Sequence, residues 1–114
     1  PPEVDARAAR LRPLVDLAIE TFFDACCAET LGAVVAWEHA RAASDPAVAA
    51  VHASIAEDEE RHAELAWTTL RWLVDRGGAP VRDALRRAVA EHDLHGASPA
   101  VATVVAPCLG AVLA

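Results

Sequence analysis

The chain has 114 residues, which is enough for one domain with a single core. Its net charge of −7, with ten arginines and no lysine, argues against a nucleic-acid partner, because binding to phosphates depends largely on cationic contacts. Hydrophobic residues make up 54% of the chain and aromatic residues only 4%, so that Ala, Val and Leu dominate and closely packed helices are favoured over a sheet sandwich.

The three cysteines do not resemble a disulfide framework. Cys26 and Cys27 are adjacent and Cys108 is distant, so we expect a reducing compartment and a cytoplasmic protein. No apolar run reaches the roughly 18 residues of a membrane helix, and no signal peptide opens the chain. Because the sequence contains no Met, even at position 1, we expect it to derive from a longer chain.

The first part of the chain predicts a short helix followed by a long one. Residues 2–11 suit a short helix, and Arg12-Pro13 should interrupt it, because the residue before a proline resists helical dihedral angles. Pro13 suits the first turn of the next helix, which we expect over about 13–43. Gly32 lies inside that helix, where glycine costs about 1 kcal/mol relative to alanine. We interpret it as allowing the close approach of a neighbouring helix or ligand.

A second long helix should follow a sharp turn. Asp45, or the serine before it, can cap this helix, and Pro46 suits its first turn. The helix should run over about 46–76 and end at Gly77-Gly78, since glycine is the usual left-handed residue after a helix.

The remaining sequence predicts shorter helices and no strands. We expect one helix over about 80–91, a loop over 92–99, and a last helix over about 99–113 that is interrupted at Pro107. The fold class is therefore all-α, in one domain over 1–114: a long antiparallel helical hairpin with shorter C-terminal helices.

The middle of the second long helix carries Glu59 and His62, three residues apart and thus on one helix face. Apolar residues lie on or beside that face: Ile55, Ala66, Leu70 and Leu73. A carboxylate and an imidazole that face an apolar interior need partners, because a buried charge without one is costly. We interpret the partner as a metal ion.

Glu29 should lie at the same level of the hairpin. It stands 16 residues before Asp45, whereas Glu59 and His62 stand 14 and 17 residues after it. At a rise of about 1.5 Å per residue, all three lie about 21–25 Å from the turn. One Glu and one Glu-x-x-His are half of the ligand set of di-metal carboxylate sites in four-helix bundles. Such carboxylates suit iron and manganese, and the histidine adds an intermediate ligand.

The segments around these residues, 24–30 and 58–67, resemble the second half of a bacterial ferritin-like protein. The resemblance covers about 13–76. In that superfamily each domain consists of two helical hairpins related by an approximate twofold, and each hairpin carries one Glu and one Glu-x-x-His. The family's ligand positions match Glu29, Glu59 and His62.

The resemblance implies half of a ferritin-like bundle, completed by a second chain in a homodimer or by a missing N-terminal hairpin. It also implies an iron cofactor, as a di-iron site, with manganese as the alternative, and either iron oxidation or redox chemistry with O2 or peroxide. We expect the open side of the hairpin to have an apolar rim formed by Phe22, Leu70 and Leu73, which would mark an interface. The alternative function is a non-catalytic helical module in which the Glu/His cluster is a buried ion-pair network without metal.

Several other polar residues have simpler interpretations. His39 and His52 should face each other near the turn, and we interpret them as surface histidines, with a second metal site as the alternative. His92 and His95 fall in the predicted loop and are also interpreted as surface residues. Arg61 is expected to pair with neighbouring carboxylates on a solvated helix face formed by Glu57, Asp58, Glu60 and Glu64.

Two apolar positions near the proposed site are assigned to packing. Cys26 lies one turn from Glu29, and we interpret it as a small apolar filler and not as a ligand. Trp67 should lie about level with Phe23 across the hairpin and pack there.

Overall fold

The computed structural model describes residues 6–92 and 99–114, and within these ranges the chain is helical and contains no strand, so the all-α prediction is confirmed. The elements in order are α1 (Ala6–Glu20), the π-helix η1 (Thr21–Cys27), α2 (Ala28–Ala42), α3 (Pro46–Gly77), α4 (Ala79–Glu91), the π-helix η3 (Val101–Val105) and α5 (Ala106–Leu113). The predicted loop falls mostly outside these ranges, as does His95.

The first helical run is longer than the sequence predicts, because Pro13 lies inside α1 and does not end it. The predicted interruption at Arg12-Pro13 is therefore wrong. An internal proline removes one N–H donor and crowds the carbonyl four residues earlier. Packing next to the proline opposes this cost, since Leu14 and Val15 pack against the hydrophobic core.

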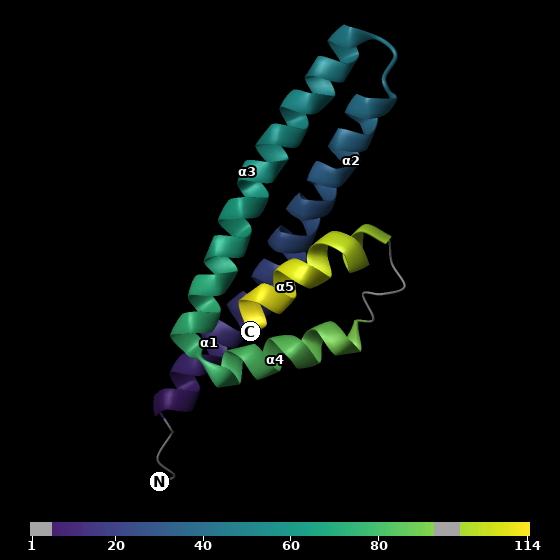
Figure 1. The fold of residues 1–114 in the computed structure, drawn as a ribbon. Coiled ribbons are helices and arrows are strands. Elements are labelled where there is room, and N and C mark those ends of the chain that lie inside the picture. The colour runs from purple at the N-terminus through teal and green to yellow at the C-terminus, as the bar shows by residue number, and fades with distance from the viewer. Residues whose placement is uncertain (1–5, 93–98) are drawn as a thin grey trace.

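Helices α2 and α3 lie side by side, with α3 running back along α2 (Figure 1). The chain reverses at Ala43, whose backbone is extended with φ −68° and ψ 127°. The Oδ1 atom of Asp45 accepts a hydrogen bond of 2.8 Å from the backbone N–H of Ala47, and Pro46 occupies the first turn of α3. A side-chain cap and a proline with a suitable φ thus define where α3 begins.

Two glycines redirect the chain from α3 into α4. Gly78 has φ +68°, a conformation that residues with a β-carbon rarely adopt. Gly77 is buried, and a β-carbon there would lie 2.1 Å from Cγ2 of Val81. The close packing of α4 against the end of α3 therefore requires a glycine at position 77.

The hydrophobic core lies at the end of the hairpin where α1, η1, α3, α4 and α5 meet, in the lower part of Figure 1. Phe22, Leu70 and Leu73 are fully or almost fully buried in it. The prediction that these residues form an exposed apolar rim is therefore wrong, because α4, η3 and α5 cover the surface that a bare hairpin would leave open. The core residues are Ala18, Phe22, Cys26, Ala66, Leu70, Leu73, Val74, Val81, Leu85, Val101, Val105, Leu109, Val112 and Leu113.

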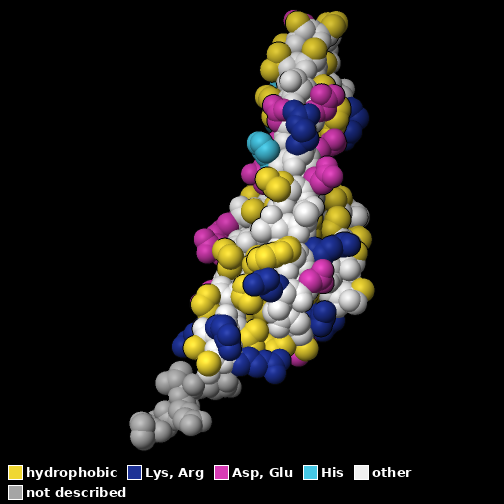
Figure 2. Space-filling view, turned by 90° about the vertical axis from the view of Figure 1, so that its left-hand side faces the viewer, with side chains coloured by type: hydrophobic (Ala, Val, Ile, Leu, Met, Phe, Trp, Pro, Cys, Tyr) yellow, Lys and Arg dark blue, Asp and Glu magenta, His cyan; other side chains and the backbone are white. Residues whose placement is uncertain are grey.

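The hairpin arm formed by α2 and the first half of α3 has little core of its own. Its buried apolar side chains are small ones, Ala33, Ala36 and Ala56, which let the two helices approach closely. Larger apolar side chains stay exposed on the arm: Val35, Val48, Val51 and Ile55. Figure 2 shows apolar side chains at the free end of this arm, above a band of acidic ones, and arginines gathered at the opposite end of the molecule.

No helix in the described ranges is both long enough and apolar enough to cross a membrane.

Candidate metal centre

Two helices supply the three side chains that the sequence singled out. Glu29 is the second residue of α2 and directly follows the π-helix η1, whereas Glu59 and His62 lie in the middle of α3. A π-helical stretch inside a longer helix is rare and is found most often at functional sites. The position of η1 next to Glu29 is therefore consistent with a site at this level of the hairpin.

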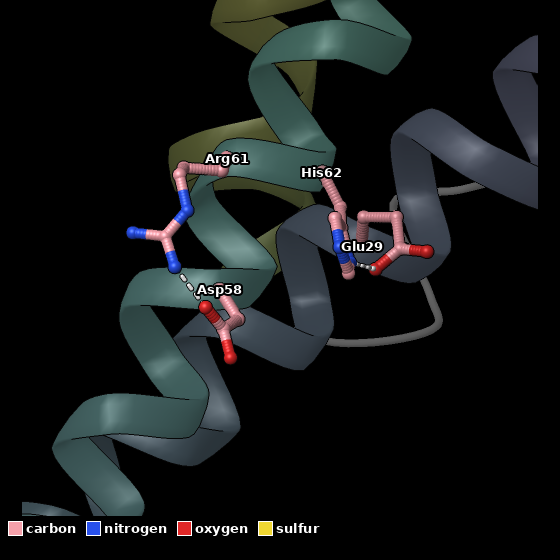
Figure 3. Close-up of polar contacts among 4 residues, drawn as sticks. All are labelled: Glu29, Asp58, Arg61 and His62. Carbon is pink, nitrogen blue, oxygen red and sulfur yellow. Dashed lines mark hydrogen bonds and ion pairs between the residues drawn. The ribbon is translucent and has the colours of Figure 1, made fainter.

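The structure brings Glu29, Glu59 and His62 together. Each of the three offers one ligand atom, and these atoms all lie within 4.8 Å of one another. Figure 3 shows Glu29 and His62 pointing towards each other from the two helices, and the Nδ1 atom of His62 is 3.6 Å from Oε2 of Glu29. The group is not enclosed, since the side chain of His62 is 60% exposed and that of Glu29 is 34% exposed.

The two carboxyl groups interact closely. A hydrogen bond with Glu29 raises the pKa of Glu59 above its ordinary value of 4.5, and partial burial and the negative charge of Glu29 act in the same direction. The nearby His62 ring has the opposite effect on the pKa of Glu59. The Glu29 carboxylate thus opposes ionisation of Glu59, and a bound metal ion would relieve this opposition.

Gly32 shapes the space for Glu59. A β-carbon at position 32 would lie 3.1 Å from Oε2 of Glu59, closer than an ordinary van der Waals contact. The sequence predicted that Gly32 permits a close approach, and the group that approaches is the Glu59 carboxylate.

A hydrogen bond between the helices holds this level of the hairpin in register. The indole N–H of Trp67 donates to the hydroxyl of Thr30 over 2.9 Å, and Thr30 is buried directly beside Glu29 in the chain. The Trp67 ring also packs edge-to-face on Phe22 at a centroid distance of 6.0 Å. The sequence predicted that Trp67 packs near Phe23 but did not predict its hydrogen bond to Thr30. The only sign of a role for Thr30 in the sequence was its position next to the proposed ligand Glu29.

The other polar residues in the middle of α3 are exposed to solvent, as predicted. Arg61 forms an ion pair with Asp58 and points away from Glu29 in Figure 3. The indole of Trp37 donates a hydrogen bond to Glu60. The exposed acidic residues in the middle of this helix are Glu57, Asp58, Glu60 and Glu64.

Two open grooves between the helices adjoin the three side chains. One has a volume of about 490 Å³ and is lined by Glu29 and His62 together with Leu65. The other also has a volume of about 490 Å³ and is lined by Glu59 together with Val35 and Ile55. Leu65 is 67% exposed, so the polar cluster is flanked by apolar side chains that solvent reaches.

The cysteine near the site belongs to the core. Cys26 is fully buried, and burial, with a smaller effect from the neighbouring Cys27, raises the pKa of its thiol to about 12. Burial also raises the pKa of Cys27 to about 11. Thiols with such pKa values are poor metal ligands and poor nucleophiles at neutral pH, in agreement with the interpretation of Cys26 as an apolar filler.

The other histidines with described positions are not part of the cluster of three. The His39 and His52 rings face each other across the hairpin with centroids 5.1 Å apart, as the sequence predicted. His92 packs on Phe23 at a centroid distance of 4.5 Å, and its Nδ1 atom is 2.8 Å from the carbonyl oxygen of Ala88.

No protein-family model, curated protein sequence or solved structure matches the chain. Its function is therefore to be inferred from the side chains of the site.

Proposed function

We propose that this chain is a ferritin-like metal-binding protein that holds iron through Glu29, Glu59 and His62. The observation that carries the proposal is the convergence of their three ligand atoms within 4.8 Å. A first-row metal such as zinc binds oxygen and nitrogen ligands at about 2.0–2.2 Å, so that two ligands of one ion lie at most about 4.4 Å apart. Partly exposed side chains can close a difference of a few tenths of an ångström by small rotations.

The donor set favours a fairly hard divalent cation. Two carboxylates supply hard oxygen ligands and negative charge, and one imidazole is an intermediate ligand, a combination that suits iron or manganese. Glu29 raises the pKa of Glu59, and a cation between the two carboxylates would stabilise the ionised form of Glu59. Glu29, Glu59 and His62 would hold the metal, as the carboxylates and histidines of di-iron carboxylate proteins do.

The chain provides half of that ligand set, so we infer that a second copy provides the rest. The three side chains are open to solvent and are flanked by exposed Val35, Ile55 and Leu65, and exposed apolar patches of this kind mark interfaces. Twofold pairing of two hairpins would bring two Glu and two Glu-x-x-His together in a four-helix bundle. A further hairpin from a longer chain would complete the same set.

The side chains of this chain would bind and orient the metal, and apolar residues of the interface would exclude bulk water. Bound ferrous iron would supply electrons to O2 or peroxide, which no side chain here can do. Iron oxidation and peroxide reduction would use the same three ligands, so the protein is either an iron-oxidising or a peroxide-reducing oxidoreductase.

A purely structural role for the cluster is the weaker candidate. An ion-pair network that fixes register and oligomer state is expected to be buried. The side chain of His62 is 60% exposed. This exposure favours a metal ligand over a buried ion-pair network.

Anaerobic Fe(II) titration of the full chain tests the proposal, with Glu59→Ala as the ligand variant and Glu57→Ala as the control. Both variants remove one carboxylate from the same helix, but only Glu59 belongs to the cluster. We expect about two irons per pair of chains, as in other di-iron bundles, in the wild type and in Glu57→Ala, and a loss of binding in Glu59→Ala. Absence of iron binding in all three proteins would leave the structural role.

A further inference from the structure

We propose that His39 and His52 form a second metal site, separate from the carboxylate cluster and suited to a nitrogen-preferring ion such as Zn²⁺. The two rings come from different helices, α2 and α3, and face each other across the hairpin near its turn. This proposal does not depend on the carboxylate cluster being an iron site.

The spacing of the two rings matches a shared ligand. Tetrahedral zinc binds imidazole nitrogen at about 2.0–2.1 Å, and this geometry places the centroids of two coordinated rings about 5 Å apart. The centroids of His39 and His52 are 5.1 Å apart, with an angle of 70° between the ring planes. An ion could therefore bridge the helices without a change in their separation.

The ring nitrogens of both histidines are available for coordination. Among the described residues, neither ring makes a hydrogen bond or an ion pair with another protein group, in contrast to His92, whose Nδ1 atom contacts the carbonyl oxygen of Ala88. His39 is exposed and His52 is half-buried, so solvent and ions reach the pair. Both rings line the open groove of about 490 Å³ that also contains Glu59.

The pair is too far from the carboxylate cluster to share an ion with it. His52 and Glu59 are seven residues apart on α3, which corresponds to about 10 Å along a helix. The two histidines therefore make a site with two protein ligands, and water would complete the coordination.

The two sites offer different ligand atoms and would therefore prefer different metals. The pair offers imidazole nitrogen alone, which suits Zn²⁺, Cu²⁺ and Ni²⁺, whereas the cluster offers mainly carboxylate oxygen. The groove of His39 and His52 also reaches Glu59, so the hairpin would hold two kinds of ion at neighbouring levels. The histidine pair also spans the turn, so that an ion bound there would tie α2 to α3 and stabilise the arm that has little core of its own.

Zn²⁺ titration of the full chain, free of any histidine tag, tests the proposal. Calorimetry would measure affinity, and ¹⁵N NMR of the histidine rings would show which nitrogens bind. The titration is performed in the wild type and in His62→Ala, which removes the histidine of the carboxylate cluster. His39→Ala and His52→Ala are made in the His62→Ala background, and His92→Ala in that background is the matched control.

We expect His62→Ala and the His92→Ala control to keep one Zn²⁺ per chain, with shifted ring nitrogens at His39 and His52. Loss of either histidine of the pair should weaken the binding by about ten-fold or more, because one of only two protein ligands is removed. The melting temperature should rise with Zn²⁺ in His62→Ala and in its His92→Ala control. It should not rise in the His39→Ala and His52→Ala variants. Circular dichroism of each variant would confirm that it is folded. Equal Zn²⁺ affinity in all four proteins, or unshifted His39 and His52 nitrogens, would overturn the proposal.

Discussion

The Glu59 carboxylate lies against Gly32, closer than a residue with a β-carbon would ordinarily allow. A β-carbon at Gly32 would lie 3.1 Å from Oε2 and 3.6 Å from Cδ of Glu59. Because the contact is with the end of a flexible side chain, the helix could accommodate a larger residue by moving the carboxylate. A substitution at position 32 can therefore change helix stability and the geometry of the site in opposite directions.

Gly32→Ala should stabilise the metal-free protein and weaken metal binding. Alanine is favoured over glycine in a helix interior by about 1 kcal/mol, whereas the added methyl group displaces Glu59 from the cluster. Thermal unfolding with a chelator and Fe(II) titration would measure the two effects. Gly110→Ala is the control, because a β-carbon there meets no atom within 4 Å. Unchanged Fe(II) affinity in Gly32→Ala would contradict a role for this spacing.

The metal-free protein should lose stability as the pH rises above about 4.5. The pKa of Glu59 is raised in the folded state by its hydrogen bond with Glu29, so the folded state holds a proton that the unfolded chain releases. The resulting stabilisation is complete below the unfolded-state value of 4.5 and is lost as the pH passes the higher folded-state pKa.

Glu59→Gln should remove that part of the pH dependence, because an amide keeps the hydrogen bond without a charge. Urea unfolding from pH 4 to pH 8 in the presence of a chelator would compare it with the wild type and with Glu57→Gln. At neutral pH we expect Glu59→Gln to be the most stable of the three and to bind metal most weakly. Parallel pH profiles for all three proteins would show that Glu29 does not raise the pKa of Glu59.

Ile55→Glu should prevent association of two copies and reduce iron binding together. The side chain is exposed and lines the groove that contains Glu59, so a charge there would be desolvated in a paired bundle. Light scattering after size exclusion would give the mass. Leu17→Glu serves as the control because Leu17 is also exposed and apolar but lines neither groove beside the cluster. A wild-type monomer at micromolar concentration that still binds the full amount of iron would rule out pairing as the way the site is completed.

Trp67→Phe should destabilise the protein by about 1–3 kcal/mol, because the buried hydroxyl of Thr30 loses its partner. Phenylalanine retains most of the packing against Phe22. Urea unfolding of Trp67→Phe, Thr30→Val and the double variant forms a cycle in which the double variant should cost less than the two single changes together. Trp72→Phe, at an exposed position, should change stability by less than about 0.5 kcal/mol. Additive effects of the two single changes would show that the hydrogen bond contributes nothing.

The thiols of Cys26 and Cys27 should react slowly in the native state. Their pKa values are raised to about 12 and about 11 by burial, so very little thiolate exists at pH 8. Labelling with a disulfide reagent at pH 8 in a Cys108→Ser variant would report on this pair alone. We expect slow labelling that becomes fast in urea, and rapid labelling of both thiols in the folded protein would contradict the packing of η1.

The sequence by itself determined the helical class, the turn at Asp45-Pro46 and the level of Glu29 with Glu59 and His62. These features follow from local rules: hydrophobic periodicity, helix capping, and a constant rise per residue that converts spacing into height. The same count placed His39 opposite His52, whose rings are 5.1 Å apart.

Only the tertiary structure decided which surfaces are open. Phe22, Leu70 and Leu73 are buried by α4, η3 and α5, whereas Val35, Ile55 and Leu65 remain exposed beside the cluster. Burial depends on which distant segments pack on a face, and helix periodicity carries no information about that. The continuity of α1 through Pro13 has the same origin, because packing of Leu14 and Val15 against the core opposes a local preference of the chain. The raised pKa of Glu59 and its contact with Gly32 likewise depend on distances between two helices, which are set by the small side chains packed between them.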